Sequence, residues 1–146
     1  MSGFLVDTNV ISEIIRPAPD ANVAAGSQQA VRSQQQDKQL LFLSVVSMGE
    51  LRKGLTVLPP SARRTQLEKS IEAQVPAWFQ GRILPVTQAI AERWGVLDGQ
   101  RQLMGRPLHV PDGQIAATAL EHDLILVTRN VKDFASMGVT IFNPWD

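Results

Sequence analysis

The stretch Phe4-Leu5-Val6-Asp7-Thr8-Asn9-Val10-Ile11-Ser12 decides the fold of this chain, because it joins a strand, an acid and a helix. Phe4 to Val6 is a short apolar run, which fits a strand buried on both faces. Asp7 stands where the run stops, and apolar residues then recur at helical spacing until Pro17 ends the pattern. In α/β proteins, ligands bind beyond the carboxyl ends of parallel strands, which is where this acid is expected to lie.

The same alternation of apolar runs and amphipathic segments continues along the chain. Further strands are predicted over residues 40–46, 83–86, 124–127 and 139–142, and helices over 21–39, 47–58, 61–75, 87–104 and 111–120. This order predicts an α/β fold, a three-layer α/β/α sandwich with a mostly parallel central sheet. We find no internal repeat and no linker, so a single domain is predicted over residues 1–146.

The composition excludes some classes of protein. The 14 basic and 14 acidic residues give a formal net charge of +0, so binding to nucleic acid through bulk positive charge is not indicated. The chain has no cysteine, which excludes disulfides and thiolate metal sites. No apolar run approaches the ~20 residues of a membrane span. We therefore expect a soluble cytoplasmic protein without a membrane partner.

Several polar side chains follow predicted strands or open predicted helices. They are the carboxylates Asp7, Glu50 and Asp112, and the segment from Thr128 to Asp133 that contains Asn130. Right-handed crossovers would bring them to one edge of the sheet. Carboxylates within ~4 Å of one another repel by roughly 4 kcal/mol per pair at an effective dielectric of 20, so such a cluster must take up protons or a cation. Oxygen ligands favour a hard ion such as Mg²⁺ or Mn²⁺.

Each of these residues also has a purely structural interpretation. Asp7 can cap the helix that follows it, and Ser47 with Glu50 has the spacing of a capping box. Asp112 is favoured at a helix start by the free amides and the macrodipole. Asn130 and Asp133 can be turn residues. His109 is interpreted as a loop residue, with a place behind the acids as the alternative.

Four stretches stand together in the order and spacing of a known family. They are LVDTNVIS at 5–12, SMGELRKG at 47–54, DGQIAATA at 112–119 and VTRNVKDF at 127–134, followed by FNPW at 142–145. In these stretches the chain resembles the PIN-domain ribonucleases, and specifically the VapC/FitB-like toxins of bacterial toxin–antitoxin systems. The resemblance runs nearly from end to end.

The resemblance implies hydrolysis of RNA phosphodiester bonds that depends on Mg²⁺, with Mn²⁺ as a possible substitute. The family's acids match Asp7, Glu50 and Asp112, of which Asp7 and Asp112 would hold the metal directly and Glu50 would act through a water. Many relatives carry an aspartate where this chain has Asn130. Asn130 is our choice for this fourth catalytic position, and Asp133 stays open as the alternative.

The resemblance also implies groups that contact the substrate and the partner. RNA would be bound by Thr8, Asn9, Arg52, Thr128 and Arg129, although each arginine can equally be a solvated surface charge. Partners would be a second copy in a homodimer and a cognate antitoxin that places an arginine among the acids, with a higher toxin–antitoxin assembly as a further expectation. Gly54 either leaves room beside Glu50 or packs between helices.

Three other functions remain open from the residues. A PIN nuclease of housekeeping type would process RNA without an antitoxin. A binding module without catalysis would use the acids only as caps, and Asn130 gives this alternative some weight. A phosphatase of the haloacid-dehalogenase type is disfavoured, because those enzymes place two aspartates one residue apart after the first strand, whereas Thr8 and Asn9 follow Asp7 here.

Overall fold

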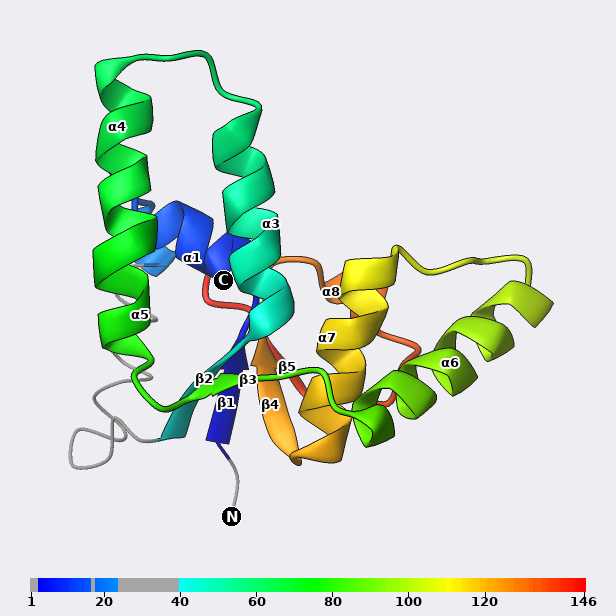
Figure 1. Ribbon diagram of the computed structural model, residues 1–146. Coiled ribbons are helices and arrows are strands. Elements are labelled where there is room, and N and C mark those ends of the chain that lie inside the picture. The colour runs from blue at the N-terminus through cyan, green and yellow to red at the C-terminus, as the bar shows by residue number, and fades with distance from the viewer. Residues whose placement is uncertain (1–2, 17, 24–39) are drawn as a thin grey trace.

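The computed structural model describes residues 3–16, 18–23 and 40–146 of the chain. Within these ranges, five strands form one sheet in the order β3-β2-β1-β4-β5, and all neighbouring pairs are parallel. The strands are β1 (Gly3–Val6), β2 (Leu41–Ser44), β3 (Ile83–Leu84), β4 (Leu124–Val127) and β5 (Ile141–Phe142). The parallel sheet predicted from the alternating pattern is confirmed (Figure 1).

The central strand β1 has its carboxyl end at the point where the strand order reverses. Val6 is in register with Leu43 of β2 on one side and with Val127 of β4 on the other. The chain therefore moves outward first through β2 and β3, and then returns to add β4 and β5 on the opposite side. Such a switch point leaves a crevice beyond the strand ends, where open α/β sheets bind their ligands.

The helices follow the predicted order along the chain, except that the short helix at residues 131–134 was not predicted. They are α1 (Thr8–Ile14), α3 (Val45–Thr56), α4 (Ala62–Lys69), the π-helical turn η2 (Ser70–Gln74), α5 (Val75–Trp78), α6 (Gln88–Leu103), α7 (Val110–Glu121) and α8 (Val131–Phe134). The helix predicted over 61–75 continues to Trp78 through η2, and the helix predicted over 87–104 is α6, with Thr87 as its N-cap. Most of the helix predicted over 21–39 lies outside the described residues.

The strand predicted over residues 40–46 is too long. It ends at Ser44, whose side chain accepts a hydrogen bond from the backbone N–H of Val46 at 3.0 Å and so becomes the N-cap of α3. Val45 and Val46 are apolar enough to extend the strand pattern, but the cap places them in the first turn of the helix.

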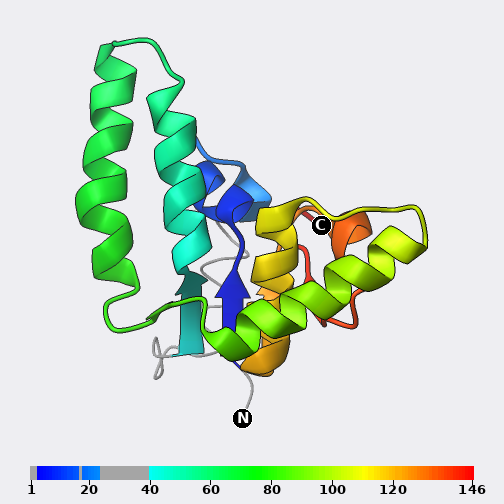
Figure 2. The same ribbon diagram turned by 45° about the vertical axis from the view of Figure 1, so that its right-hand side comes forward.

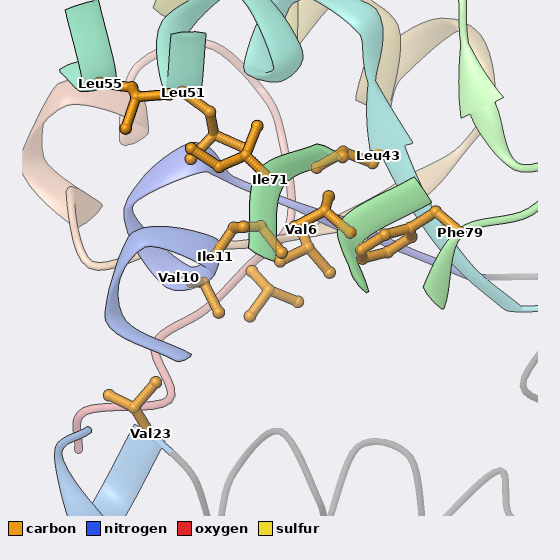
Figure 3. Close-up of a cluster of buried hydrophobic side chains, with 11 residues drawn as sticks. Val6, Val10, Ile11, Val23, Leu43, Leu51, Leu55, Ile71 and Phe79 are labelled. Carbon is orange, nitrogen blue, oxygen red and sulfur yellow. The ribbon is translucent and has the colours of Figure 1, made fainter. Parts of the chain in front are cut away.

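Helices cover both faces of the sheet, because alternate residues of the central strands point to opposite sides. Val6 and Val127 pack with α1, α3 and the η2–α5 segment in the cluster of Figure 3. Leu5 and Leu126 pack instead with α7 and α8. The three-layer α/β/α arrangement is confirmed, and Figure 2 shows the α3–α4 hairpin rising beyond the carboxyl edge of the strands.

In the described ranges, every helix is too short or too polar to span a lipid bilayer.

Candidate active site

An open pocket of about 410 Å³ lies beyond the carboxyl end of β1, at the switch point of the sheet. The predicted acids Asp7, Glu50 and Asp112 all line it, and so does Asn130. They come from four separate parts of the chain. The other described residues of the lining are Thr8, Asn9, Ser12, Glu13, Arg16, Arg129 and Trp145. The expectation that these side chains meet at one sheet edge is therefore correct, whereas their roles in chemistry stay predictions.

Asp7 is both a helix cap and a member of the pocket. Its Oδ1 accepts a hydrogen bond from the backbone N–H of Thr8 at 2.7 Å, and its Oδ2 accepts one from Thr128 Oγ1 at 2.7 Å. The residue is only 2% exposed. Burial raises the pKa of Asp7 from its ordinary 3.8 to about 6, the two hydrogen bonds oppose this shift, and the charges of Asp112 and Glu50 add to it.

This shift predicts a pH dependence of stability in the absence of metal ions. A carboxyl group whose pKa is raised on folding binds its proton more tightly in the native state, so stability is lost as the pH rises through the interval from 3.8 to about 6. The free energy of unfolding of Asp7→Asn, measured with denaturant in EDTA, is expected to gain roughly 2 kcal/mol relative to wild type between pH 4 and pH 7. A difference that stays constant with pH would show that Asp7 is not buried as described.

Glu50 is held by a hydroxyl of another helix. Thr8 Oγ1 lies 2.6 Å from Glu50 Oε1 and 2.9 Å from Ser47 Oγ. A threonine hydroxyl has one proton and a carboxylate can only accept, so Thr8 donates to Glu50 and accepts from the fully buried Ser47. The capping-box interpretation of Ser47 and Glu50 is wrong, because α3 begins at Val45 and has Ser44 as its cap. The glutamate is thus available to the pocket.

Asp112 lies in the first turn of α7, after Pro111. Burial raises the pKa of this carboxyl group, His109 lowers it, and the negative charges of Glu50 and Asp133 raise it further. His109 Nδ1 lies 3.6 Å from Asp112 Oδ2, and the imidazole is largely exposed. The helix start therefore places Asp112 in the pocket, and His109 is the exposed loop residue before α7, as predicted, with its ring beside Asp112.

The fourth polar position is organised around Thr128, which is fully buried. Besides donating to Asp7, its Oγ1 accepts hydrogen bonds from Asn9 Nδ2 at 3.3 Å and from the backbone N–H of Asn130 at 3.0 Å. Asn130 lines the pocket, and its side chain makes no capping bond to α8. Asp133 is exposed and is not among the described lining residues. The geometry favours Asn130 over Asp133 at this position.

The sequence that carries Asp7, Glu50, Asp112 and Asn130 matches a known protein family. The PIN domain family fits the sequence over residues 4–139, which includes all four polar positions. This chain belongs to the PIN domain family.

Two curated relatives share the whole length of this PIN domain. It is 33% identical to Toxin FitB of Neisseria gonorrhoeae over 142 residues, which cover 97% of this chain and 98% of the relative. It is 34% identical to the VapC ribonuclease Y4jK of Sinorhizobium fredii over 143 residues, 98% of each chain. The solved structure of FitAB bound to an IR36 DNA fragment superposes with a TM-score of 0.82 at 31% identity, covering 98% of this chain and 96% of that chain.

Three arginines near the acids of this PIN domain differ in where they point. Arg129 and Arg16 line the pocket, and Arg16 forms an ion pair with Glu13 at 3.0 Å. Arg52, predicted to contact substrate, instead reaches across from α3 to Glu68 and Glu72 at 3.7 and 3.1 Å. It is not among the described residues that line the pocket. Among the described salt bridges, the pocket arginine without an acidic partner is therefore Arg129, whereas Arg52 joins α3 to the following helical segments.

The donor set fits a hydrated hard cation. Within residues 3–16, 18–23 and 40–146, no three acidic or histidine side chains lie close enough together to bind one ion directly. Mg²⁺ does not need such a cluster, because it usually keeps several waters and takes one or two protein carboxylates. The pocket supplies only oxygen donors, and two of its carboxyl groups have pKa values raised by burial. A bound cation would offset the cost of ionising them.

Sequence reasoning missed four residues of the pocket: Ser12, Glu13, Arg16 and Trp145. Glu13 lies in the last turn of α1 and Arg16 lies just after its C-cap, three residues further on, so the i,i+3 spacing of opposite charges could have indicated their ion pair. Trp145 belongs to the FNPW stretch that carries the family resemblance, but nothing in that stretch indicated the pocket, because the position of Trp145 depends on how the chain returns after β5.

Proposed function

We propose that this PIN domain is a Mg²⁺-dependent endoribonuclease that hydrolyses RNA phosphodiester bonds. The observation that carries the proposal is the buried Asp7 carboxyl group, which shares one open pocket with Glu50 and Asp112. A fold that only needed helix caps would not have to gather three acids at the point where the strand order reverses. The full-length likeness to a VapC ribonuclease supports RNA as the substrate. Mn²⁺ would suit the same donors.

Each polar group has a role in this proposal. Asp7 and Asp112 would hold the cation, and Glu50 would reach it through a water. The cation would supply a Lewis acid for the phosphate and lower the pKa of a bound water. Because Thr8 fixes one oxygen of Glu50, the other oxygen can orient the attacking water and accept its proton. Asn130 would bind a water or a phosphate oxygen through its amide without adding charge.

We also propose that the nuclease is the toxin of a toxin–antitoxin pair and acts in the cytoplasm as a homodimer. The relative FitB is named a toxin, and FitAB has been solved on DNA, which supports a cognate antitoxin and a larger assembly. An antitoxin arginine entering the acidic pocket would replace the charge of the cation and block the site.

The surface beside Glu50 fits an apolar segment of such a partner. A second pocket of about 290 Å³ adjoins the acids and is lined mainly by α1, α3 and α4, including Leu51, Leu55 and Gly54. The two leucines are almost fully buried, so their main role is core packing. Outside its own helix backbone and chain neighbours, no described residue has an atom within 4 Å of the position that a Cβ of Gly54 would occupy, which favours open space over helix packing at this glycine.

Binding of Mg²⁺ should be visible without RNA. An ion that binds only the native state raises the melting temperature by mass action. If 10 mM Mg²⁺ or Mn²⁺ is about 100 times the dissociation constant of the ion, Tm is expected to be several degrees higher in metal than in EDTA. Asp112→Asn should lose most of this rise. A wild-type Tm that does not respond to millimolar metal would favour a binding module in which the acids are only caps.

The decisive experiment for the function is cleavage of RNA by the purified protein. Total cellular RNA incubated with the protein and Mg²⁺ is expected to gain new ends at defined positions, which sequencing would locate, and EDTA should prevent them.

The toxin role has a separate test. If it is right, expression of the protein should arrest growth, and co-expression with a small DNA-binding protein encoded directly upstream should relieve that arrest. Defined cleavage without any such neighbour would instead indicate a housekeeping nuclease, and an absence of cleavage with either metal would refute the nuclease.

A further inference from the structure

Trp145 lines the acidic pocket, and both its backbone N–H and its backbone carbonyl are hydrogen-bonded. Its backbone N–H donates to Asn143 Oδ1 at 2.9 Å, and its carbonyl oxygen accepts a hydrogen bond from Asn22 Nδ2 at 3.0 Å. The indole also packs against the hydrophobic cluster formed by α1, α3 and the η2–α5 segment. The ring is therefore held in place by contacts that involve neither the acids nor a substrate.

The guanidinium of Arg129 stacks over this ring. Its Cζ lies 5.3 Å from the ring centroid, within the range of a cation–π interaction. Arg129 is an exposed residue that also lines the pocket, and its backbone N–H points to Asn9 Oδ1 at 3.4 Å. In the described part of the chain, no salt bridge or hydrogen bond uses its guanidinium. Stacking occupies the face of a guanidinium and leaves its N–H edge available to an oxyanion.

We propose that Trp145 is a positioning residue that holds Arg129 at the mouth of the pocket, ready to bind a phosphate of the RNA backbone. This inference rests on the proposed function, which supplies RNA as the ligand. An exposed arginine loses much rotamer freedom when it binds a phosphate, and a stacked arginine has lost part of that freedom beforehand. Trp145 therefore strengthens substrate binding through Arg129, without touching the reacting atoms.

The stack itself is testable in the free protein. In a ¹⁵N-edited NMR spectrum, the Nε–Hε signal of Arg129, identified by its absence in Arg129→Lys, is expected to be displaced by the ring current of the indole. Trp145→Leu should return the signal to the ordinary arginine position, while Trp145→Phe should keep part of the displacement. A signal that Trp145→Leu does not move would overturn the proposal, whatever the protein does to RNA.

The consequence for binding is testable with a double-mutant cycle. The probe is a fluorescein-labelled pool of 20-nucleotide RNAs of randomised sequence, with Ca²⁺ in place of Mg²⁺ to prevent cleavage. Trp145→Leu is expected to weaken binding about threefold and Arg129→Gln about tenfold. In the Arg129→Gln background, Trp145→Leu should add less than about twofold, because the two residues act as one unit. Trp145→Phe should restore most of the affinity.

A matched control separates positioning from general damage to the fold. Arg16 also lines the pocket, but it is paired with Glu13, and among the described residues no hydrogen bond, ion pair or cation–π interaction joins it to Trp145. Trp145→Leu and Arg16→Gln should therefore be additive. For cleavage of RNA in Mg²⁺, Trp145→Leu should raise KM and leave kcat unchanged. The lost interaction would bind the RNA equally well before and in the transition state.

The outcomes distinguish this inference from the proposed function. If wild type binds and cuts RNA but Trp145→Leu and Arg129→Gln are additive, only the positioning role is wrong. If wild type neither binds nor cuts RNA, the nuclease proposal fails and the positioning role fails with it.

Discussion

Replacing Asp7 with asparagine is expected to lower the rate of RNA cleavage by about a thousandfold while the protein stays folded. The amide keeps the size of the side chain and can still accept the hydrogen bond from the Thr8 backbone that caps α1. It removes the negative charge that would hold the cation, and several kcal/mol of transition-state stabilisation go with it, each 1.36 kcal/mol being tenfold in rate. Cleavage of labelled RNA in Mg²⁺ under single-turnover conditions measures the loss.

The same substitution should make the metal-free protein more stable near neutral pH, because burial raises the pKa of Asp7 to about 6 and ionising it costs free energy. Loss of activity together with an unchanged or higher Tm would therefore show that Asp7 acts in the site and is not needed for the core.

Asp123→Asn is a suitable control for the Asp7 variant, since Asp123 lies before β4 with φ of 53°, a conformation that asparagine tolerates. It should cut RNA at the wild-type rate. A folded Asp7→Asn variant with wild-type activity would contradict the proposed site.

Replacing Thr128 with valine is expected to lower both stability and cleavage. The fully buried hydroxyl donates to Asp7 and accepts from Asn9 and from the Asn130 backbone, so valine removes all three hydrogen bonds at nearly constant volume. Buried polar groups left without partners cost roughly 1–3 kcal/mol each, and we expect a loss of about 2–3 kcal/mol in the free energy of unfolding. Cleavage should fall by about a hundredfold, because Asp7 and Asn130 lose their common anchor.

Thr128→Ser provides the matched control for this prediction. Serine keeps the hydroxyl and loses only a methyl group, so its free energy of unfolding should fall by about 1 kcal/mol, with activity within a few-fold of wild type. Denaturant unfolding in EDTA and the cleavage assay give the two measurements. If serine proves as damaging as valine, packing of the methyl group rather than the hydrogen-bond network controls this position.

Much of the fold was predictable because its signals are local. Apolar runs of four or so residues, interrupted by helical periodicity, predicted the parallel sheet and the order of its helices. The strand after residue 40 was predicted too long for an equally local reason. Val45 and Val46 continue the apolar pattern, and only the capping geometry of Ser44 shows that the helix has already begun.

The candidate site was predictable only in part. Strand ends of a parallel sheet share one edge, and this rule was enough to bring together Asp7, Glu50 and Asp112 before any geometry was known. It did not reveal that Thr8 holds Glu50, nor that Arg52 is paired with Glu68 and Glu72 instead of facing the pocket. Such pairings depend on the separation and rotation of helices, which periodicity does not specify.

The sequence by itself determined the layers, the edge at which the acids meet and the family to which the chain belongs, because each depends on residue types at short or regular spacing. The tertiary structure alone decided how those residues act. It buried Asp7 enough to raise its pKa, chose Asn130 over Asp133 for the pocket and set Trp145 beneath Arg129. Desolvation and stacking are properties of groups that meet only after the chain has folded, so no local pattern records them.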